Sequence, residues 1–63
     1  MATEVKVGVG DKIEIVCMDG EPTYEGRTGV VEYIDDIGQL HGTWGGLAVI
    51  PDVDIVKIVT KAP

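Results

Sequence analysis

Short apolar runs separated by strong turn signals fill the second half of the chain, and this alternation constrains the fold more than any other feature. The apolar runs cover residues 29–34, 40–44, 47–50 and 55–58. The turn signals between them, rich in Asp, Gly and Pro, cover residues 35–38, 45–46 and 51–54. Strands at this spacing predict a small all-β barrel.

The first half adds one clear strand and one long loop. Residues 12–17 alternate, which predicts a strand with Ile13, Ile15 and Cys17 facing the core and Lys12 and Glu14 facing outward. Residues 18–28 contain a proline, two glycines and three acidic residues, so we expect a loop rather than a helix. The domain should cover residues 9–60, between a flexible arm at residues 1–8 and a frayed end at residues 61–63.

The turn signals predict how successive strands are connected. Asp35-Asp36-Ile37-Gly38 predicts a hairpin with Gly38 in the left-handed region, and Gly45-Gly46 predicts a second, two-residue hairpin. Because Pro51 cannot continue a ladder, residues 51–54 predict one 3₁₀ turn before the last strand. The expected fold is therefore a five-stranded all-β barrel with a single 3₁₀ turn.

Alternation also assigns side chains to the faces of the later strands. Val31 and Tyr33 share one face, and Leu40, Gly42 and Trp44 share one face of the following strand. If the latter face is inward, Gly42 leaves room for a large ring. The chain has no phenylalanine, so we expect the rings of Trp44 and Tyr33 to fill the core rather than form an exposed platform.

Composition narrows the classes of partner and compartment. The 63 residues carry five Lys and Arg against eleven Asp and Glu, a formal net charge of −6. Such a surface repels phosphate backbones and anionic membranes. One cysteine and one histidine allow neither an intramolecular disulfide nor a zinc finger. The charge leads us to expect a protein that binds neither membranes nor nucleic acids. Because the first residues lack a signal-peptide pattern, we also expect it to be cytoplasmic.

Two pieces of the sequence resemble known barrels. Gly10-Asp11-Lys12-Ile13-Glu14-Ile15, followed by residues 26–35, is similar to the strand-loop-strand element of KOW-type barrels. Residues 46–51 are similar to the junction of strand and 3₁₀ turn in SH3 domains. Val53 and Asp54 stand where many peptide-binding SH3 domains carry a tyrosine, and the loops are acidic where RNA-binding KOW barrels are basic. The resemblance therefore implies an SH3-like scaffold and neither ligand.

The run from residue 10 to residue 58 also resembles a small bacterial and phage domain family of unknown function that is common on mobile elements. The residues that carry this resemblance are Gly10-Asp11-Lys12-Ile13, Gly26-Arg27-Thr28-Gly29-Val30-Val31, residues 35–41, Trp44 and residues 50–54. This resemblance implies no particular chemistry.

Few residues could carry catalysis or bind a metal. Asp35 and Asp36 could begin a divalent-metal site, but adjacent residues point apart and Asp-Asp-x-Gly is common turn chemistry. His41 could act as an acid or base only beside a partner, and the chain contains no serine. Cys17 lies on the expected core face, where a free thiol packs as a small hydrophobe. We therefore expect no enzyme, no metal and no cofactor.

The candidate binding surface combines the long loop with one strand face. Tyr24 lies in the acidic loop, where it is either exposed to a partner or packed within the loop. The candidate binding residues are Glu21, Tyr24, Glu25, Arg27 and His41. Alternation also leaves four aliphatic residues opposite the core, namely Val16, Val30, Ile55 and Val59. They imply either an exposed apolar patch or a bulge that turns some of them inward.

These observations favour a non-enzymatic protein-interaction module, an accessory protein of a mobile element. It would bind a basic patch on a protein partner through residues 18–27 and the apolar strand face. A homodimer formed through that face is a variant of this hypothesis. The alternative is a nucleic-acid-binding KOW-like barrel, which would have to gather on one face Lys6, Lys12, Arg27, Lys57 and Lys61.

Overall fold

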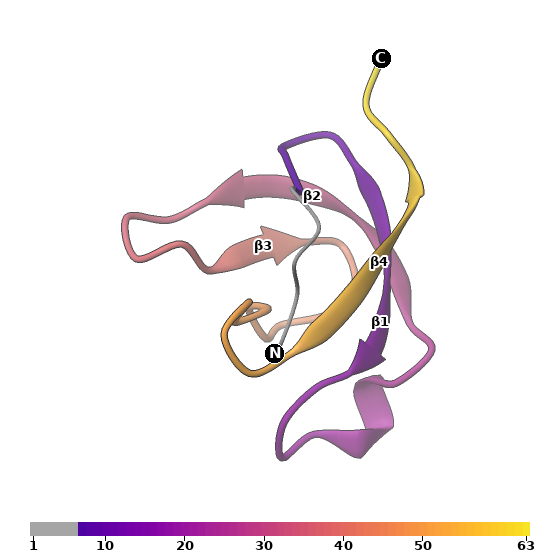
Figure 1. The fold of residues 1–63 in the computed structure, drawn as a ribbon, viewed down its shortest axis with the longest axis vertical. Helices are drawn as coiled ribbons and strands as arrows, with labels where there is room; N and C mark the ends of the chain where they lie inside the picture. Colours follow the sequence, from indigo (N-terminus) through magenta and orange to yellow (C-terminus); the bar gives the residue numbers. More distant parts are fainter. Residues whose placement is uncertain (1–6) are drawn as a thin grey trace.

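One antiparallel sheet carries the fold, which a computed structural model describes for residues 7–63. Its strands are β1 (Lys12–Cys17), β2 (Thr28–Ile34), β3 (Leu40–Gly42) and β4 (Ile55–Thr60), and one 3₁₀ helix, η1 (Pro22–Tyr24), lies between β1 and β2 (Figure 1). The all-β prediction is confirmed. Most of the expected N-terminal arm, residues 1–6 with Lys6, lies outside the described residues.

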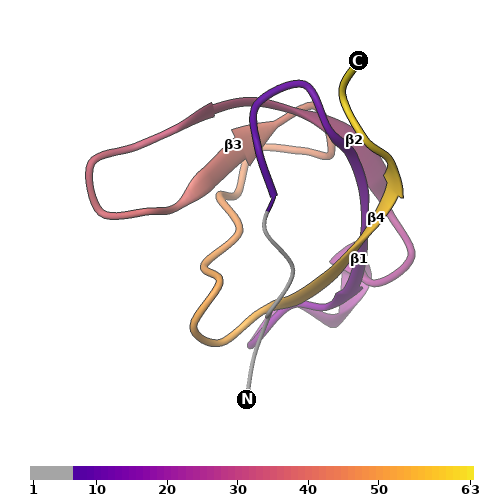
Figure 2. The ribbon, with the colours of Figure 1, turned by 45° about the horizontal axis from the view of Figure 1, so that its top comes forward.

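The strands are ordered β3-β2-β1-β4, so the two edges of the sheet are formed by its last two strands in sequence. Ile13, near the start of β1, lies opposite Gly29 on β2 and Ile58 on β4. In Figure 2 the sheet curls, and the segment between β3 and β4 crosses its open side. That segment, residues 43–54, therefore covers the concave side of the sheet and supplies core residues of its own.

The structure has four strands rather than the expected five in residues 7–63. Residues 47–50 contribute only an isolated bridge, in which Val49 and Leu40 exchange two backbone hydrogen bonds of 2.8 Å. The expected two-residue hairpin at Gly45-Gly46 is absent from this part of the described chain. The reason is local, because the Trp44 indole N–H donates to the Leu47 carbonyl and holds a wider loop.

The 3₁₀ helix is not at the expected place. Residues 51–53 form a hydrogen-bonded turn, in which the N–H groups of Val53 and Asp54 both donate to the Ile50 carbonyl. The Asp54 carboxylate also accepts the Ile50 N–H, which closes this turn from the other side. The helix forms instead at Pro22–Tyr24, inside the segment expected to lack one, where a proline in the first turn fits its φ requirement.

The core lies between the sheet and residues 43–54. Ile13, Ile15 and Val31 come from the two central strands, and Trp44 and Val49 come from the covering segment. The prediction of a buried Trp44 is confirmed. Its ring lies against Gly42, where a Cβ would overlap the ring and the Val30 carbonyl oxygen. The room that Gly42 was expected to leave for a large ring is thus filled by Trp44.

Tyr33 is exposed, with 54% of its surface accessible, so the prediction that it packs in the core is wrong. The β2–β3 register shifts between Val31 and Tyr33, leaving Glu32 without a partner on β3. Such a bulge reverses the alternation beyond it. Tyr33 therefore turns away from the core, and Ile34 is the residue that lies opposite buried Leu40.

The four aliphatic residues opposite the core all remain exposed, namely Val16, Val30, Ile55 and Val59. The β1–β4 register does shift between Ile15 and Cys17, so a bulge is present at Val16. It does not turn Val16 inward, and it leaves Cys17 only half-buried. Of the two interpretations of these residues, exposure is therefore the observed one.

A buried carboxylate joins the two ends of the described chain. Asp11, just before β1, is 1% exposed and accepts hydrogen bonds from the Gly8 N–H, the Ala62 N–H and the Lys61 ammonium at 2.7–2.9 Å. The Gly8 and Ala62 N–H groups, followed by Lys61, lower the pKa of Asp11 to about 2. These bonds hold Ala62 and Lys61, at the end expected to fray, against the start of β1.

Candidate functional site

The five candidate binding residues lie in two separate places. Glu21, Tyr24, Glu25 and Arg27 belong to the connection between β1 and β2, whereas His41 is on β3. Since β3 pairs with the opposite end of β2, the structure does not gather all five into one site. The two groups are therefore considered separately.

Tyr24 and Arg27 are packed against each other and lie against Trp44 and Gly45. The Arg27 guanidinium carbon lies 4.1 Å from the centre of the Tyr24 ring, and the guanidinium donates a 3.0 Å hydrogen bond to the Trp44 carbonyl. Gly45 lies beside this pair, where a side chain would not fit, since a Cβ there would lie 2.8 Å from the Tyr24 hydroxyl. Tyr24 is half-buried against the core. The two side chains thus fix the loop, while Glu21 and Glu25 remain exposed.

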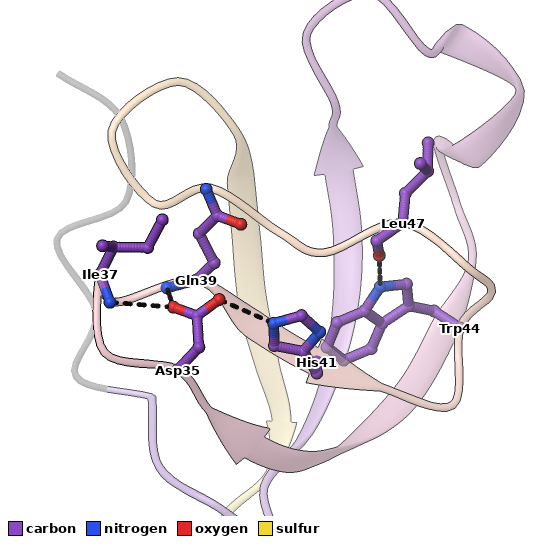
Figure 3. A network of polar contacts seen from close by, with 6 residues as sticks. All are labelled: Asp35, Ile37, Gln39, His41, Trp44 and Leu47. Carbon is purple, nitrogen blue, oxygen red and sulfur yellow. Dashed lines mark hydrogen bonds and ion pairs between the residues drawn. The ribbon is translucent and has the colours of Figure 1, made fainter.

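His41 belongs to a polar network at the β2–β3 hairpin (Figure 3). Its Nε2 donates to one oxygen of Asp35 at 2.8 Å, and its ring stacks on Tyr33 with 4.3 Å between the centroids. The other Asp35 oxygen accepts the N–H groups of Ile37 and Gln39. The His41 bond, followed by the Gln39 N–H, lowers the pKa of Asp35. Gly38 has a φ of 84°, the left-handed conformation expected for this turn.

Asp35 acts in this network as a turn residue that organises the hairpin. Asp35 uses both oxygens on the hairpin, and within residues 7–63 no three His, Cys, Asp or Glu side chains are grouped to hold a metal. An Asp-bound imidazole can act as a base, but it needs a nucleophile or substrate beside it. The chain has no serine, and Cys17 lies on β1, which β2 separates from β3.

A pocket of about 250 Å³ lies between the start of the β1–β2 connection and the segment that precedes β4. Its lining is mainly apolar, with carboxylates on both walls, Asp19 and Glu21 on the connection and Asp54 before β4. The lining residues are Met18, Asp19, Glu21, Leu47, Ala48, Ile50, Val53 and Asp54. Of the five candidate binding residues, only Glu21 reaches it.

Asp54 holds the two walls of this pocket together. It is buried, and one carboxylate oxygen accepts the Asp19 N–H while the other accepts the Ile50 N–H, both at 2.8 Å. Sequence reasoning missed Asp54 because it treated this residue only as part of a 3₁₀ turn at residues 51–54. The available signal was the Asp four residues after Ile50 at the end of a proline turn, a spacing from which a carboxylate can reach back to a backbone N–H.

The described cations do not form a basic face. Arg27 is held by Tyr24 and the Trp44 carbonyl, and Lys61 binds Asp11 at 2.9 Å. Lys57 on β4 lies 3.7 Å from Glu14 on β1, and Lys12 is exposed on β1. Positive charge is thus spread over several elements and largely matched by carboxylates or a carbonyl.

Comparison with known proteins identifies a family. The family model of DUF4314, a domain of unknown function, matches residues 4–59. No curated protein and no solved structure is significantly similar to the chain. Within residues 7–63, no helix is long and apolar enough to cross a membrane. The comparisons therefore bring no known activity to the geometry described above.

Proposed function

Because the chain belongs to the DUF4314 family, whose function is unknown, we propose that it is a non-enzymatic module that binds another protein. Its finer fold in this proposal is an SH3-like barrel, with residues 47–50 in the place of the missing strand. The bridge between Leu40 and Val49 supports this reading. The proposal keeps the setting implied by the sequence, a cytoplasmic accessory protein of a bacterial or phage mobile element.

The observation that carries the proposal is a surface on which exposed aliphatic side chains stand among carboxylates. Three aliphatic residues of the short segment 47–53 are 39–49% exposed, namely Leu47, Ile50 and Val53. Glu21 and Asp19 lie beside them around the pocket. Apolar side chains gathered on an acidic surface fit a protein partner that offers both apolar area and positive charge.

The nucleic-acid alternative gains no support from the cations. A phosphate-binding face needs several unmatched Lys or Arg side chains close together, because affinity comes mainly from such contacts. Arg27, Lys57 and Lys61 are instead engaged within the described chain. We therefore retain the protein-binding function as the proposal.

The test is a selection from a random peptide display library on the immobilised protein, with amide NMR titrations as readout. We expect enrichment of peptides that carry both cationic and apolar residues, and weaker binding of the selected peptides as salt is raised. A pool of short single- and double-stranded oligonucleotides at low salt is the parallel arm. Saturable oligonucleotide binding together with a failed peptide selection would replace the proposal with the nucleic-acid alternative.

A further inference from the structure

The pocket between the β1–β2 connection and residues 47–54 has the properties of an anchor site. We propose that it receives one apolar side chain from a partner segment in which Lys or Arg residues flank that side chain. This inference rests on the proposed protein-binding function and adds to it the place and the chemistry of the contact. Three properties of the pocket support it: its size, its charge and its rigidity.

The size of the pocket matches a side chain better than a cofactor. Its volume is about 250 Å³. Pockets for small molecules usually hold roughly 300–1,000 Å³, so this one lies below their range. Met18 is buried beneath the site, and Leu47, Ile50 and Val53 are partly exposed around it. An aliphatic side chain entering from outside would thus meet apolar surface on several sides.

The charge of the lining selects the neighbours of that side chain. Asp19, Glu21 and Asp54 are among the lining residues, and the lining contains no Lys, Arg or His. Asp19 and Glu21 are exposed, and Asp52, in the turn of residues 51–53 that precedes β4, is a further exposed carboxylate. Cationic residues on both sides of an apolar anchor would meet these carboxylates, whereas acidic residues there would be repelled. The occupant is therefore a basic segment rather than a second copy of this chain, whose net charge is −6.

The walls are held in position before anything binds. Asp54 joins Asp19 to Ile50, and the Ile50 carbonyl accepts the N–H groups of Val53 and Asp54. The Trp44 indole N–H fixes the Leu47 carbonyl at 2.8 Å (Figure 3). A preformed pocket loses little conformational entropy on binding, which favours even a short segment.

The experiment is an NMR titration of the full chain with three capped pentapeptides at low salt. The first probe is Lys-Lys-Leu-Lys-Lys, the second replaces Leu with Ala, and the third is Glu-Glu-Leu-Glu-Glu. We expect saturable shifts of the amide and methyl signals of Met18, Leu47, Ala48, Ile50 and Val53 with the first probe. The second probe should bind about tenfold more weakly or worse, because the anchor is shortened, and the third should not bind.

A pair of matched variants tests the location. Val53→Lys puts a cation at the pocket, and Val9→Lys makes the same change shortly before β1; the two residues are 49% and 57% exposed in the native chain. Val53→Lys should weaken the binding of the first probe at least about tenfold, while Val9→Lys, outside the pocket lining, should weaken it much less. The comparison of the first two probes on the unaltered chain stands even if one variant fails to fold.

The outcomes separate this inference from the function on which it rests. Equal binding of the Leu and Ala probes, or shifts centred on Val16, Val30 and Val59, would overturn the anchor pocket while leaving a protein-binding function in place. If the three probes and every peptide from the display selection leave the spectrum unchanged, both the pocket and the function fall. Binding of the acidic probe equal to that of the basic one would contradict the charge argument.

Discussion

At the scale of single residues, Gly42 has the tightest surroundings among the glycines of the described chain. A Cβ at this position would overlap the Trp44 ring and the Val30 carbonyl oxygen. Because the obstacles are a buried ring and backbone, neither can yield without moving β2 or the core. We expect Gly42→Ala to lower the free energy of unfolding by about 3 kcal/mol, measured by urea denaturation followed through Trp44 fluorescence.

Gly46→Ala is the matched control for that substitution. No atom lies within 4 Å of a Cβ built at Gly46, and Gly46 is not among the glycines with positive φ. The same change there should alter the free energy of unfolding by no more than about 0.5 kcal/mol. Equal losses in the two variants would show that glycine flexibility, rather than the contact with Trp44, explains the effect.

At the scale of elements, the β2–β3 hairpin depends on one carboxylate of an adjacent pair. Asp35 accepts the N–H groups of Ile37 and Gln39 and binds His41, whereas Asp36 is exposed. Asp35→Ala should therefore lower Tm by several degrees and shift the amide signals of Ile37 and Gln39. Asp36→Ala, the same change one residue later, should leave both nearly unchanged. A larger effect of Asp36→Ala in thermal denaturation would contradict the turn role of Asp35.

The elements also show which parts of the fold a local pattern can predict. Alternation correctly assigned Ile13 and Ile15 to the core because β1 is regular up to the bulge at Val16. It failed at Tyr33, because a single unpaired residue on β2 reverses every later assignment and leaves no periodic signal in the sequence. The all-β class survives such errors, since it depends on the turns and not on the phase of any one strand.

The candidate site was less predictable than the strands, for a related reason. In the loop of residues 18–27, Glu21 and Glu25 are exposed, but Tyr24, the residue expected to contact a partner or pack within the loop, lies with Arg27 against Trp44 and Gly45. Asp54 organises the pocket through the backbone N–H of Asp19, 35 positions away in the sequence. A contact between such distant residues depends on the curl of the whole sheet, which no local pattern contains.

At the scale of the whole molecule, Asp11 ties both ends of the described chain to the sheet, and this linkage has a pH dependence. The Gly8 and Ala62 N–H groups and Lys61 lower its pKa from 3.8 to about 2. The folded state therefore binds a proton less readily than the unfolded state. The stabilisation is complete above about pH 4 and is lost as pH falls toward about 2. Asp35, whose pKa is also lowered, adds to the loss in the same direction.

The prediction concerns the urea midpoint of the full chain between pH 6 and pH 2. The wild type should lose stability steeply below about pH 4. Asp11→Asn should be less stable at pH 6, because the NH₂ group of the new amide would face the hydrogen-bond donors of Gly8 and Lys61. Its stability should also fall less steeply with acid, because it has no carboxylate to protonate at this position. Asp35, whose pKa is also lowered, should contribute to the slope that remains. An unchanged slope in Asp11→Asn would mean that the buried carboxylate does not govern acid unfolding.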